Sequence, residues 1–303
     1  MNELFDLKTE DDELEVRFGN VKPITRIEFN NVIHKLKSLG FLTECIHGTY
    51  LLRIIHPEND TRGEIEYLQN IKKYCRTNSL DGVKFIQKKR VAKPYDVKDY
   101  NFRVNLKSEK EGGIINESDG KIFRFLKRFT FTHPDLSLKV DCSIVKMSRK
   151  RKNRYVPYIN VIDSGVFDGS ETYEIEIEIG KLEKKEGMNQ LKKVIKYVLA
   201  GIQQTNYPIS YKEMKKIGLE YLSLIHGKNE NREILPKDFI GPSSISLEMP
   251  NIMKEGVLHT NYSVTDKADG YRKLLFISKS GKVYLIDTNM NFQFTGCISK
   301  KFK

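Results

Sequence analysis

The 303-residue sequence contains no tryptophan, only four cysteines and no long apolar run. A membrane-spanning helix needs roughly 18 consecutive apolar residues, and no segment of the sequence approaches that length. The start of the chain is acidic, whereas a signal or transit peptide would be basic. No two cysteines form a C-x-x-C pair, which argues against a zinc site and against a disulfide framework. These absences favour a folded protein that remains in the reducing compartment where it is made.

Positive charge is what the sequence has in excess. The 52 Lys and Arg residues outnumber the 40 Asp and Glu residues, which gives a formal net charge of +12. Such a surplus attracts polyanions such as nucleic acid or a phosphate-rich ligand, although it can also serve solubility alone. The chain length corresponds to one large or two ordinary domains.

The alternation of apolar and polar residues predicts a mainly β protein of the α+β class. Eight strands are expected at about residues 10–19, 44–56, 82–92, 100–109, 121–132, 137–147, 153–163 and 171–180. Helices are expected at about residues 25–40, 65–76, 188–203 and 211–225. Thr25 with Glu28, and Ser210 with Glu213, have the spacing of capping boxes. The runs KLLFIS and KVYLID predict further strands near the C-terminus.

Two of the expected strands concentrate carboxylates on one face. Because side chains alternate along a strand, EIEIEIG and ELEVRFG each separate a polar from an apolar face. The polar faces carry Glu174, Glu176 and Glu178 in one strand and Glu13, Glu15 and Arg17 in the other. An ordinary half-exposed sheet would show the same alternation. A row of like charges repels itself, however, and glutamate oxygens suit magnesium or manganese, which would neutralise them.

The strands between these two are basic at alternate positions. They carry Lys88, Arg103, Arg124, Lys127, Arg128 and Lys139, with Glu109 and Asp141 interspersed. In a single strand, such residues more often form a solvated face than a binding site. If the eight strands closed into a barrel with their polar faces inward, carboxylates would line one wall and cations the others. That arrangement suits a metal-bound polyphosphate.

At these residues the sequence resembles the triphosphate tunnel metalloenzymes, in particular the RNA 5′-triphosphatase domain of mRNA capping enzymes from large DNA viruses and fungi. That family is defined by an ExExR or ExExK first strand and an ExE last strand, as in ELEVR and EIEIE here. The resemblance covers roughly residues 10–225. The strand RFLKRFTF is similar to the family's R-x-K-x-R strand, but Leu126 holds the lysine position and Lys127 comes one place late. Either Lys127 or Arg128 then faces the phosphates.

The resemblance implies an eight-stranded antiparallel β-tunnel with flanking helices. It also implies an activity: metal-dependent removal of the γ-phosphate from triphosphate-ended RNA, the first step of mRNA capping. The implied partner is 5′-triphosphate RNA and the implied cofactor Mg²⁺ or Mn²⁺. The implied metal ligands are Glu13, Glu15, Glu176 and Glu178, with Glu174 and Arg128 as further catalytic residues. The candidate phosphate-binding residues are Arg17, Arg53, Lys88, Arg103, Lys127 and Arg128, supported by Glu109 and Asp141.

A second signature lies near the C-terminus, in the run SVTDKADGYR. Its K-x-D-G pattern resembles the nucleophile motif of covalent nucleotidyltransferases, the capping guanylyltransferases and polynucleotide ligases. The resemblance implies that Lys267 attacks the α-phosphate of GTP to form a lysyl-GMP adduct, and that Arg272 contacts the nucleotide. The alternative is a solvated lysine in a hairpin turn.

Roughly 35 residues follow Lys267, which is too few for the other motifs of a nucleotidyltransferase domain. We therefore expect either a fragment of a longer capping enzyme or a degenerate second domain. GTP binding and GMP transfer, with Lys267 as the catalytic nucleophile, would belong to the complete parent protein. The expected organisation is a triphosphatase tunnel domain at 1–225, a linker at 226–250 and the truncated N-terminal part of a guanylyltransferase domain at 251–303.

Two other functions fit the same pattern. A charged tunnel could hydrolyse free nucleoside triphosphates or polyphosphate, and basic strands could serve a noncatalytic RNA-binding module of a capping complex. No membrane and no DNA partner is expected. A viral source, and with it the host cytoplasm or the virion, is what the capping-type resemblance implies.

Overall fold

The structure is a computed structural model, and it describes residues 2–9, 12–179, 184–227, 231–241, 248, 263, 265–266 and 269–300. The chain divides into two compact units, Met1–Gln204 and Thr205–Lys303. The helix expected at 211–225 lies in the second unit, whereas the expected tunnel domain at 1–225 includes it. Lys267 and parts of the expected linker at 226–250 lie outside the described residues.

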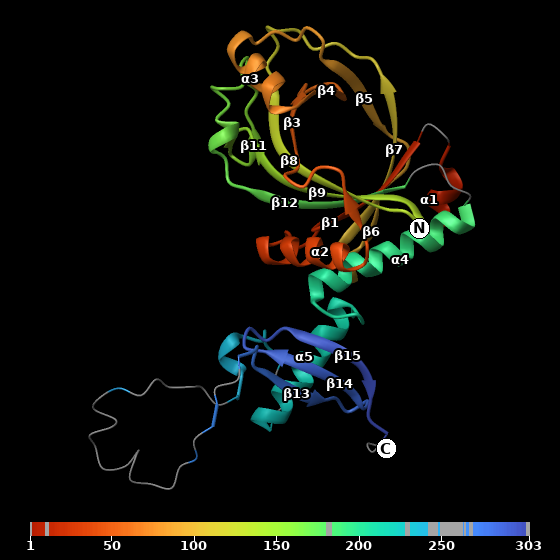
Figure 1. Ribbon diagram of the computed structural model, residues 1–303, viewed down its shortest axis with the longest axis vertical. Coiled ribbons are helices and arrows are strands. Elements are labelled where there is room, and N and C mark those ends of the chain that lie inside the picture. Colours follow the sequence, from red (N-terminus) through yellow and green to blue (C-terminus); the bar gives the residue numbers. More distant parts are fainter. Residues whose placement is uncertain are drawn as a thin grey trace. The chain divides into compact units, whose positions relative to one another are not determined.

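Eight antiparallel strands close into a barrel in the first unit, as the sequence predicts (Figure 1). Their order around the barrel is β1, β12, β9, β8, β3, β4, β5 and β7, and the pairing of β7 with β1 closes the ring. Their bounds are β1 Asp12–Phe18, β3 Thr49–Ile55, β4 Thr61–Glu66, β5 Lys84–Arg90, β7 Phe102–Glu111, β8 Ile122–His133, β9 Leu136–Met147 and β12 Thr172–Ile179. The short strands β2, Leu42–Thr43, and β6, Tyr95–Val97, pair with β8 and β7.

One predicted barrel strand was wrong. Of the segment 153–163, only Arg154–Tyr155 (β11) forms a strand, and it pairs with Lys150–Arg151 (β10) outside the barrel, while Tyr158 makes a single bridge to Lys121. The place in the barrel belongs to β4, which the sequence analysis missed. Its alternation is hidden because Gly63 occupies one of the buried positions. A Cβ atom at Gly63 would lie 2.9 Å from Val83 Cγ1, so a larger residue would force this neighbour to move.

In its described residues the first unit has four α-helices: α1 Asn2–Leu7, α2 Arg26–Ser38, α3 Leu68–Thr77 and α4 Lys184–Gln203. Short 3₁₀ turns lie at η1, Lys98–Tyr100, and η2, Val166–Asp168. The capping box predicted at the start of α2 is confirmed. The Glu28 amide donates to Thr25 Oγ1 over 3.2 Å, and the Thr25 amide donates to Glu28 Oε2 over 2.8 Å.

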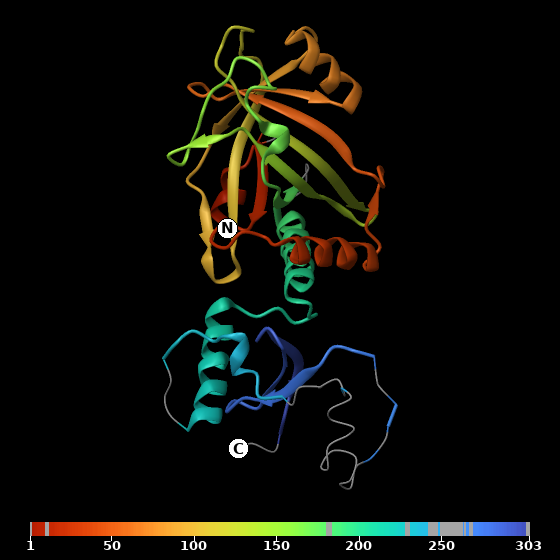
Figure 2. The ribbon, with the colours of Figure 1, turned by 90° about the vertical axis from the view of Figure 1, so that its left-hand side faces the viewer.

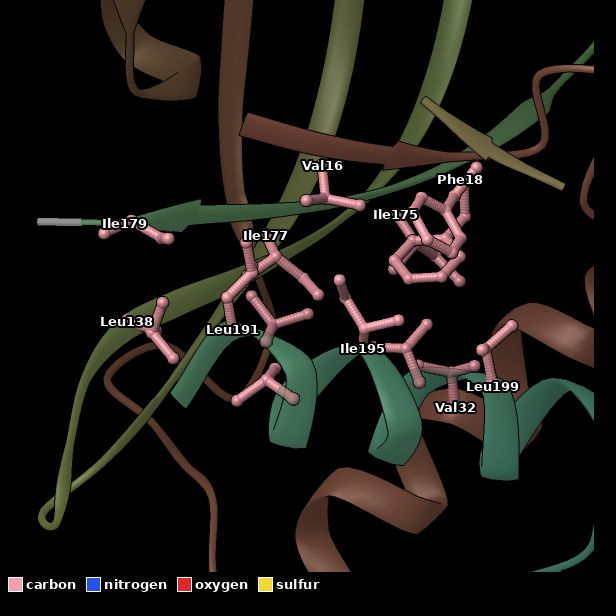
Figure 3. Packing of buried hydrophobic residues seen from close by; sticks show 14 of the residues in the cluster. Val16, Phe18, Val32, Leu138, Ile175, Ile177, Ile179, Leu191, Ile195 and Leu199 are labelled. Atoms are coloured by element: carbon pink, nitrogen blue, oxygen red, sulfur yellow. The ribbon is translucent and has the colours of Figure 1, made fainter. Parts of the chain in front are cut away.

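The largest apolar core lies outside the barrel, between its wall and the helices α2 and α4 (Figure 3). Ile175, Ile177 and Ile179 of β12 are buried there, against α4 residues such as Leu191 and Ile195. Burying one such side chain stabilises the fold by about 1.5 to 3 kcal/mol. The outer core therefore fixes the orientation of β12, and with it the direction of the three glutamates on the opposite face.

The second unit is a three-stranded antiparallel sheet packed on one helix. Its elements are α5 Tyr211–His226, η3 Pro236–Asp238, β13 Lys273–Ile277, β14 Lys282–Asp287 and β15 Phe292–Ile298. The strands predicted from KLLFIS and KVYLID are confirmed. Ile217 and Tyr221 of α5 pack on Phe276, Tyr284 and Phe292 of the sheet. Within the described residues of both units, no helix is long and apolar enough to cross a membrane.

Candidate active site

The two carboxylate strands lie side by side in the barrel. β1 and β12 pair so that Glu15 is opposite Glu178 and Arg17 is opposite Glu176. Because the isoleucines of β12 face the outer core, its glutamates face the interior. The registers of the other strands carry the same polar face around the ring. The barrel therefore encloses a charged tunnel, which we define as the interior of the eight strands.

On one part of this wall, each carboxylate is held by a lysine. Lys88 Nζ donates to Glu13 Oε2 over 2.7 Å. Glu15, which is 5% exposed, accepts from Lys107 over 2.5 Å and from Asn105 over 2.9 Å. Lys139 Nζ lies 2.5 Å from Glu178 Oε2. Charge-assisted contacts of this length hold both partners in place.

Glu13 and Glu178 are also neighbours of each other. Burial and then the Glu13 charge raise the pKa of Glu178. Burial alone would raise the pKa of Glu13 as well, but Lys88, a hydrogen bond from Glu178 and the Lys139 charge together lower that pKa below its usual range. One site thus brings together two carboxylates that resist being charged at the same time, which is a setting that a cation would relieve.

A second part of the wall is rich in arginine. Arg124 donates to Glu174 over 2.7 Å, and Arg17 contacts the same carboxylate. On β4, Glu64 accepts from Arg53 over 2.6 Å and lies 3.1 Å from Arg62. Burial and the neighbouring Arg53 lower the pKa of Arg62 to about 10. The Nε atoms of Arg62 and Arg124 are buried without a hydrogen-bond partner. This part of the tunnel therefore has donors to spare for an anion.

Arg128 lies between these two parts and is held from several sides. Its guanidinium is 2.9 Å from Asp141 Oδ2, 3.2 Å from the Ser143 hydroxyl and 3.8 Å from Glu176. Asp141, which is 1% exposed, also accepts from Thr130 over 2.6 Å. The guanidinium of Arg128 is thereby fixed in orientation within the tunnel.

The structure brings together most of the residues that the sequence analysis selected. Those on the tunnel wall are Glu13, Glu15, Arg17, Arg53, Lys88, Glu109, Arg128, Asp141, Glu174, Glu176 and Glu178. Arg103 shares this face but is turned to Asp96, with its Nε 2.6 Å from the carboxylate. Glu109 contacts Lys88 and lies 3.8 Å from Arg62.

The structure corrects the prediction that Lys127 is a phosphate-binding residue. It lies on the outer face of β8, where its ammonium sits 5.7 Å from the Tyr50 ring centroid and 5.5 Å from that of Phe129. Because successive side chains of a strand alternate, Arg128 faces the tunnel and Lys127 cannot. At the C-terminal signature, Arg272 is exposed, and Lys267 lies outside the described residues.

Five further charged residues of the tunnel were not among the candidate site residues: Arg62, Glu64, Lys107, Arg124 and Lys139. Arg62 and Glu64 were missed because β4 was missed. Lys107 and Lys139 lie on predicted strands, and only the register shows that they hold Glu15 and Glu178. The alternation of charged and apolar residues in these strands was the signal that could have found them.

The donor chemistry of the tunnel fits a hard divalent cation, since glutamate oxygens dominate it. The close pair Glu13 and Glu178, with Glu15 and Glu176 at neighbouring wall positions, is the best candidate ligand set. In the part of the chain that the structure describes, no three acidic or sulfur or imidazole side chains converge on one point. Glu13, Glu15 and Glu178 are instead held by lysines. The residue types therefore fit a divalent cation, while the side chains are arranged as ion pairs with lysines.

A closed antiparallel barrel with carboxylates and cations facing inward defines the first unit as a tunnel suited to polyanions. Sequence comparison finds two similarities to known proteins. Residues 197–298 match the family model of the mRNA capping enzyme, catalytic domain. Over 176 residues, which is 58% of this chain, the sequence is 30% identical to a probable mRNA-capping enzyme of Acanthamoeba polyphaga mimivirus. The match covers 13% of that relative. These matches confirm the resemblance to viral-type mRNA capping enzymes.

Solved structures give weaker similarities. The RNA triphosphatase domain of the trifunctional mimivirus mRNA capping enzyme is 16% identical, with a TM-score of 0.48, and the match covers 65% of this chain and 96% of that one. The RNA triphosphatase Pct1 of S. pombe is 14% identical, with a TM-score of 0.43, and the match covers 62% of this chain and 79% of that one.

Proposed function

We propose that the first unit is a metal-dependent RNA 5′-triphosphatase that removes the γ-phosphate of triphosphate-ended RNA in mRNA capping. The observation that carries this proposal is the tunnel wall itself. Carboxylates of β1 and β12 are concentrated beside lysines and arginines of the remaining strands, inside a closed barrel. The sequence match to a probable capping enzyme supports mRNA, rather than a free nucleotide, as the source of the triphosphate.

The ion pairs of the tunnel suggest how a metal-bound triphosphate would be accepted. Such a ligand brings charges of both signs, so Glu13 and Glu178 can turn to the metal while Lys88 and Lys139 turn to the phosphates. The ion pairs within the tunnel are then replaced by ion pairs with the ligand. No charge is left unpaired in the buried site, where it would cost several kcal/mol. A divalent cation, when bound, polarises a phosphoryl oxygen and neutralises part of its charge.

The chain's own residues supply position and charge. Phosphoryl transfer needs positive groups around the equatorial oxygens and a water in line with the leaving group. Arg128, fixed by Asp141 and Ser143, is suited to an equatorial oxygen because its guanidinium can donate two parallel hydrogen bonds. Glu176, 3.8 Å from Arg128, is suited to orient the water. Arg53 and Arg124 add positive charge near the phosphates that follow the γ-phosphate.

The test is phosphate release from γ-labelled triphosphate RNA and from ATP, with Mg²⁺ or Mn²⁺ and with a chelator. The proposal predicts metal-dependent release from RNA. Release from ATP or polyphosphate alone would favour a hydrolase of free triphosphates. RNA binding without release from any substrate would favour a noncatalytic module.

For the second unit we propose the N-terminal part of a guanylyltransferase domain, with Lys267 as the GMP acceptor in a complete parent protein. The match of residues 197–298 to the capping enzyme catalytic domain includes Lys267, and this supports the proposal. Incubation with α-labelled GTP and magnesium tests it. We expect no protein-bound GMP on this chain, and a labelled adduct in a longer parent chain that Lys267→Arg abolishes.

A further inference from the structure

A strongly basic hairpin stands outside the barrel. β10 and β11 pair through Lys150 with Tyr155 and through Arg151 with Arg154. Five of the six residues at 149–154 are cations, and all six are exposed. Nothing in the proposed triphosphatase reaction uses this hairpin.

The hairpin is formed by its own sequence. Lys152 and Asn153 have φ angles of 48° and 63°, the two positive values that a two-residue type I′ turn requires. The Lys150 ammonium lies 4.5 Å from the centroid of the Tyr155 ring, which holds that lysine against the hairpin. The hairpin is thus formed without a ligand, so binding would cost little conformational entropy.

The cations of the hairpin differ from those of the tunnel in having no counter-charge among the described residues. Tunnel cations such as Lys88, Lys107 and Arg128 each contact a carboxylate. Among the residues that the structure describes, no carboxylate lies within 4.0 Å of a cation at 149–154. Like charges this close repel one another, and only an external anion can compensate them.

The position of the hairpin ties it to one end of the tunnel. It follows directly after β9, and its base is held to the first unit by the Ser148 amide, which donates to the Phe123 carbonyl over 2.9 Å. The last residue of β9, Met147, is opposite Arg124, which in turn is opposite Arg53. The end of the barrel beside the hairpin is therefore the arginine-rich part of the tunnel. Figure 2 shows the hairpin, in green, projecting from the barrel.

We infer that the hairpin Arg149–Arg154 is a second, sequence-independent site that binds the phosphate backbone of the RNA behind its triphosphate end. The inference rests on the proposed triphosphatase function for the direction of the RNA. With the γ-phosphate at the carboxylates of β1 and β12, the remaining phosphates point to the arginine-rich end, and the following nucleotides leave beside the hairpin. Exposed Lys and Arg residues contact such a backbone without reading its sequence.

This site gives the enzyme a means to prefer RNA ends over free triphosphates. ATP and tripolyphosphate end before they can reach the hairpin, whereas RNA gains several phosphate contacts there. Log affinity falls as log salt concentration rises, and each phosphate contact with a single strand makes this slope steeper by roughly 0.7. The hairpin should therefore lower the KM for triphosphate RNA and leave kcat unchanged, because it touches no reacting atom.

Binding of a 5′-hydroxyl RNA 20-mer tests the site without any need for catalysis. The variant Lys150→Gln/Arg151→Gln/Lys152→Gln/Arg154→Gln removes four charges and keeps Arg149, which packs on Gly165. We expect its affinity to fall at least about 10-fold at low salt, and its salt slope to fall by about 2 to 3. The matched control neutralises four lysines of α4, Lys185, Lys192, Lys193 and Lys196, and should lose less than about 3-fold.

The two proposals fail in different ways. If neither RNA nor tripolyphosphate releases phosphate, the triphosphatase proposal falls, while the 5′-hydroxyl RNA still tests the hairpin. If release occurs, the hairpin variant should keep the parent's rate on tripolyphosphate, which also reports that it is folded, and show a KM for triphosphate RNA raised at least about 10-fold. Equal RNA affinity for the parent and the hairpin variant would overturn the inference. So would an equal loss in the α4 control.

Discussion

The two faces of the barrel wall come from the same strands and differ completely in how they are stabilised. On β12, Ile175, Ile177 and Ile179 face outward and are buried among apolar side chains of α4. The glutamates between them face inward and are held by lysines and arginines. Burial of apolar area stabilises the first face, whereas the second gathers charges at a cost that ion pairing only partly offsets. The outer face thus carries stability, and the inner face is free to carry function.

This comparison predicts the largest contrast at two adjacent residues of β8. Arg128→Gln removes the guanidinium that Asp141, Ser143 and Glu176 hold in the tunnel. Loss of one such fixed donor typically costs on the order of 100-fold or more in turnover. Lys127→Gln, one residue away on the outer face, should change phosphate release by less than about 2-fold. A large loss at Lys127 with little loss at Arg128 would reverse our assignment of the two faces.

The outer face is tested for stability with Ile177→Ala. Ile177 is 0% exposed, and truncating such a residue costs about 2 to 5 kcal/mol of unfolding free energy. The matched control is Ile27→Ala on α2, which is 69% exposed and should cost less than about 0.5 kcal/mol. Both are measured by urea unfolding, and activity per folded molecule should be unchanged. Equal effects at the two positions would argue against the outer core as the source of stability.

The inner face is tested for cation binding by thermal unfolding with and without metal. A cation that binds only the folded state adds about 2.7 kcal/mol at a concentration 100 times its Kd. We therefore expect Mn²⁺ or Mg²⁺ to raise the unfolding midpoint of the parent, and to raise it much less for Glu178→Gln. Glu66→Gln, an exposed carboxylate at the end of β4, is the control and should respond like the parent. An equal rise in all three proteins would place the cation elsewhere.

The smallest effect is expected in the second unit, at Asp238, a buried carboxylate that is not part of the tunnel. Asp238, which is 5% exposed, accepts from Arg232 over 2.6 Å and from the Leu235 amide over 2.9 Å. The Arg232 contact holds the pKa of Asp238 well below its ordinary value. Its contribution to stability is therefore present above the ordinary pKa of about 4 and is lost as pH falls further. Asp238→Asn should cost about 1 to 2 kcal/mol at pH 7 and flatten this acid loss. An unchanged acid profile would assign the loss to other groups.

The sequence predicted the inner and outer faces of β1 and β12 because a period of two needs no tertiary information. The strand β4 could not be predicted in the same way, because Gly63 is explained only by the close approach of Val83, which lies just before β5. The sequence indicates the helix α5 but not the unit to which it belongs. Its apolar face packs on strands that begin at Lys273, far along the chain, and nothing local indicates that partner.

For the candidate site, the sequence predicted most of the residues but not how they pair. Residue type and alternation selected the glutamates and most of the cations. Which cation holds which carboxylate depends on register, so the pairs of Lys107 with Glu15 and of Lys139 with Glu178 emerged only from the fold. At β8 the motif left Lys127 and Arg128 open, and the pairing of Arg128 with Ser143 decided between them.

The account is tested most directly by metal-dependent phosphate release from γ-labelled triphosphate RNA, measured for the parent and for Glu15→Gln. Glu15 is central because it is opposite Glu178 and is buried in the tunnel. The substitution keeps the shape of the side chain and its contact with Asn105 while removing the charge. We predict release by the parent in Mn²⁺ or Mg²⁺, and a loss of at least about 100-fold in a Glu15→Gln protein that unfolds at the parent's temperature. Release by that folded variant at the parent's rate would contradict the tunnel mechanism.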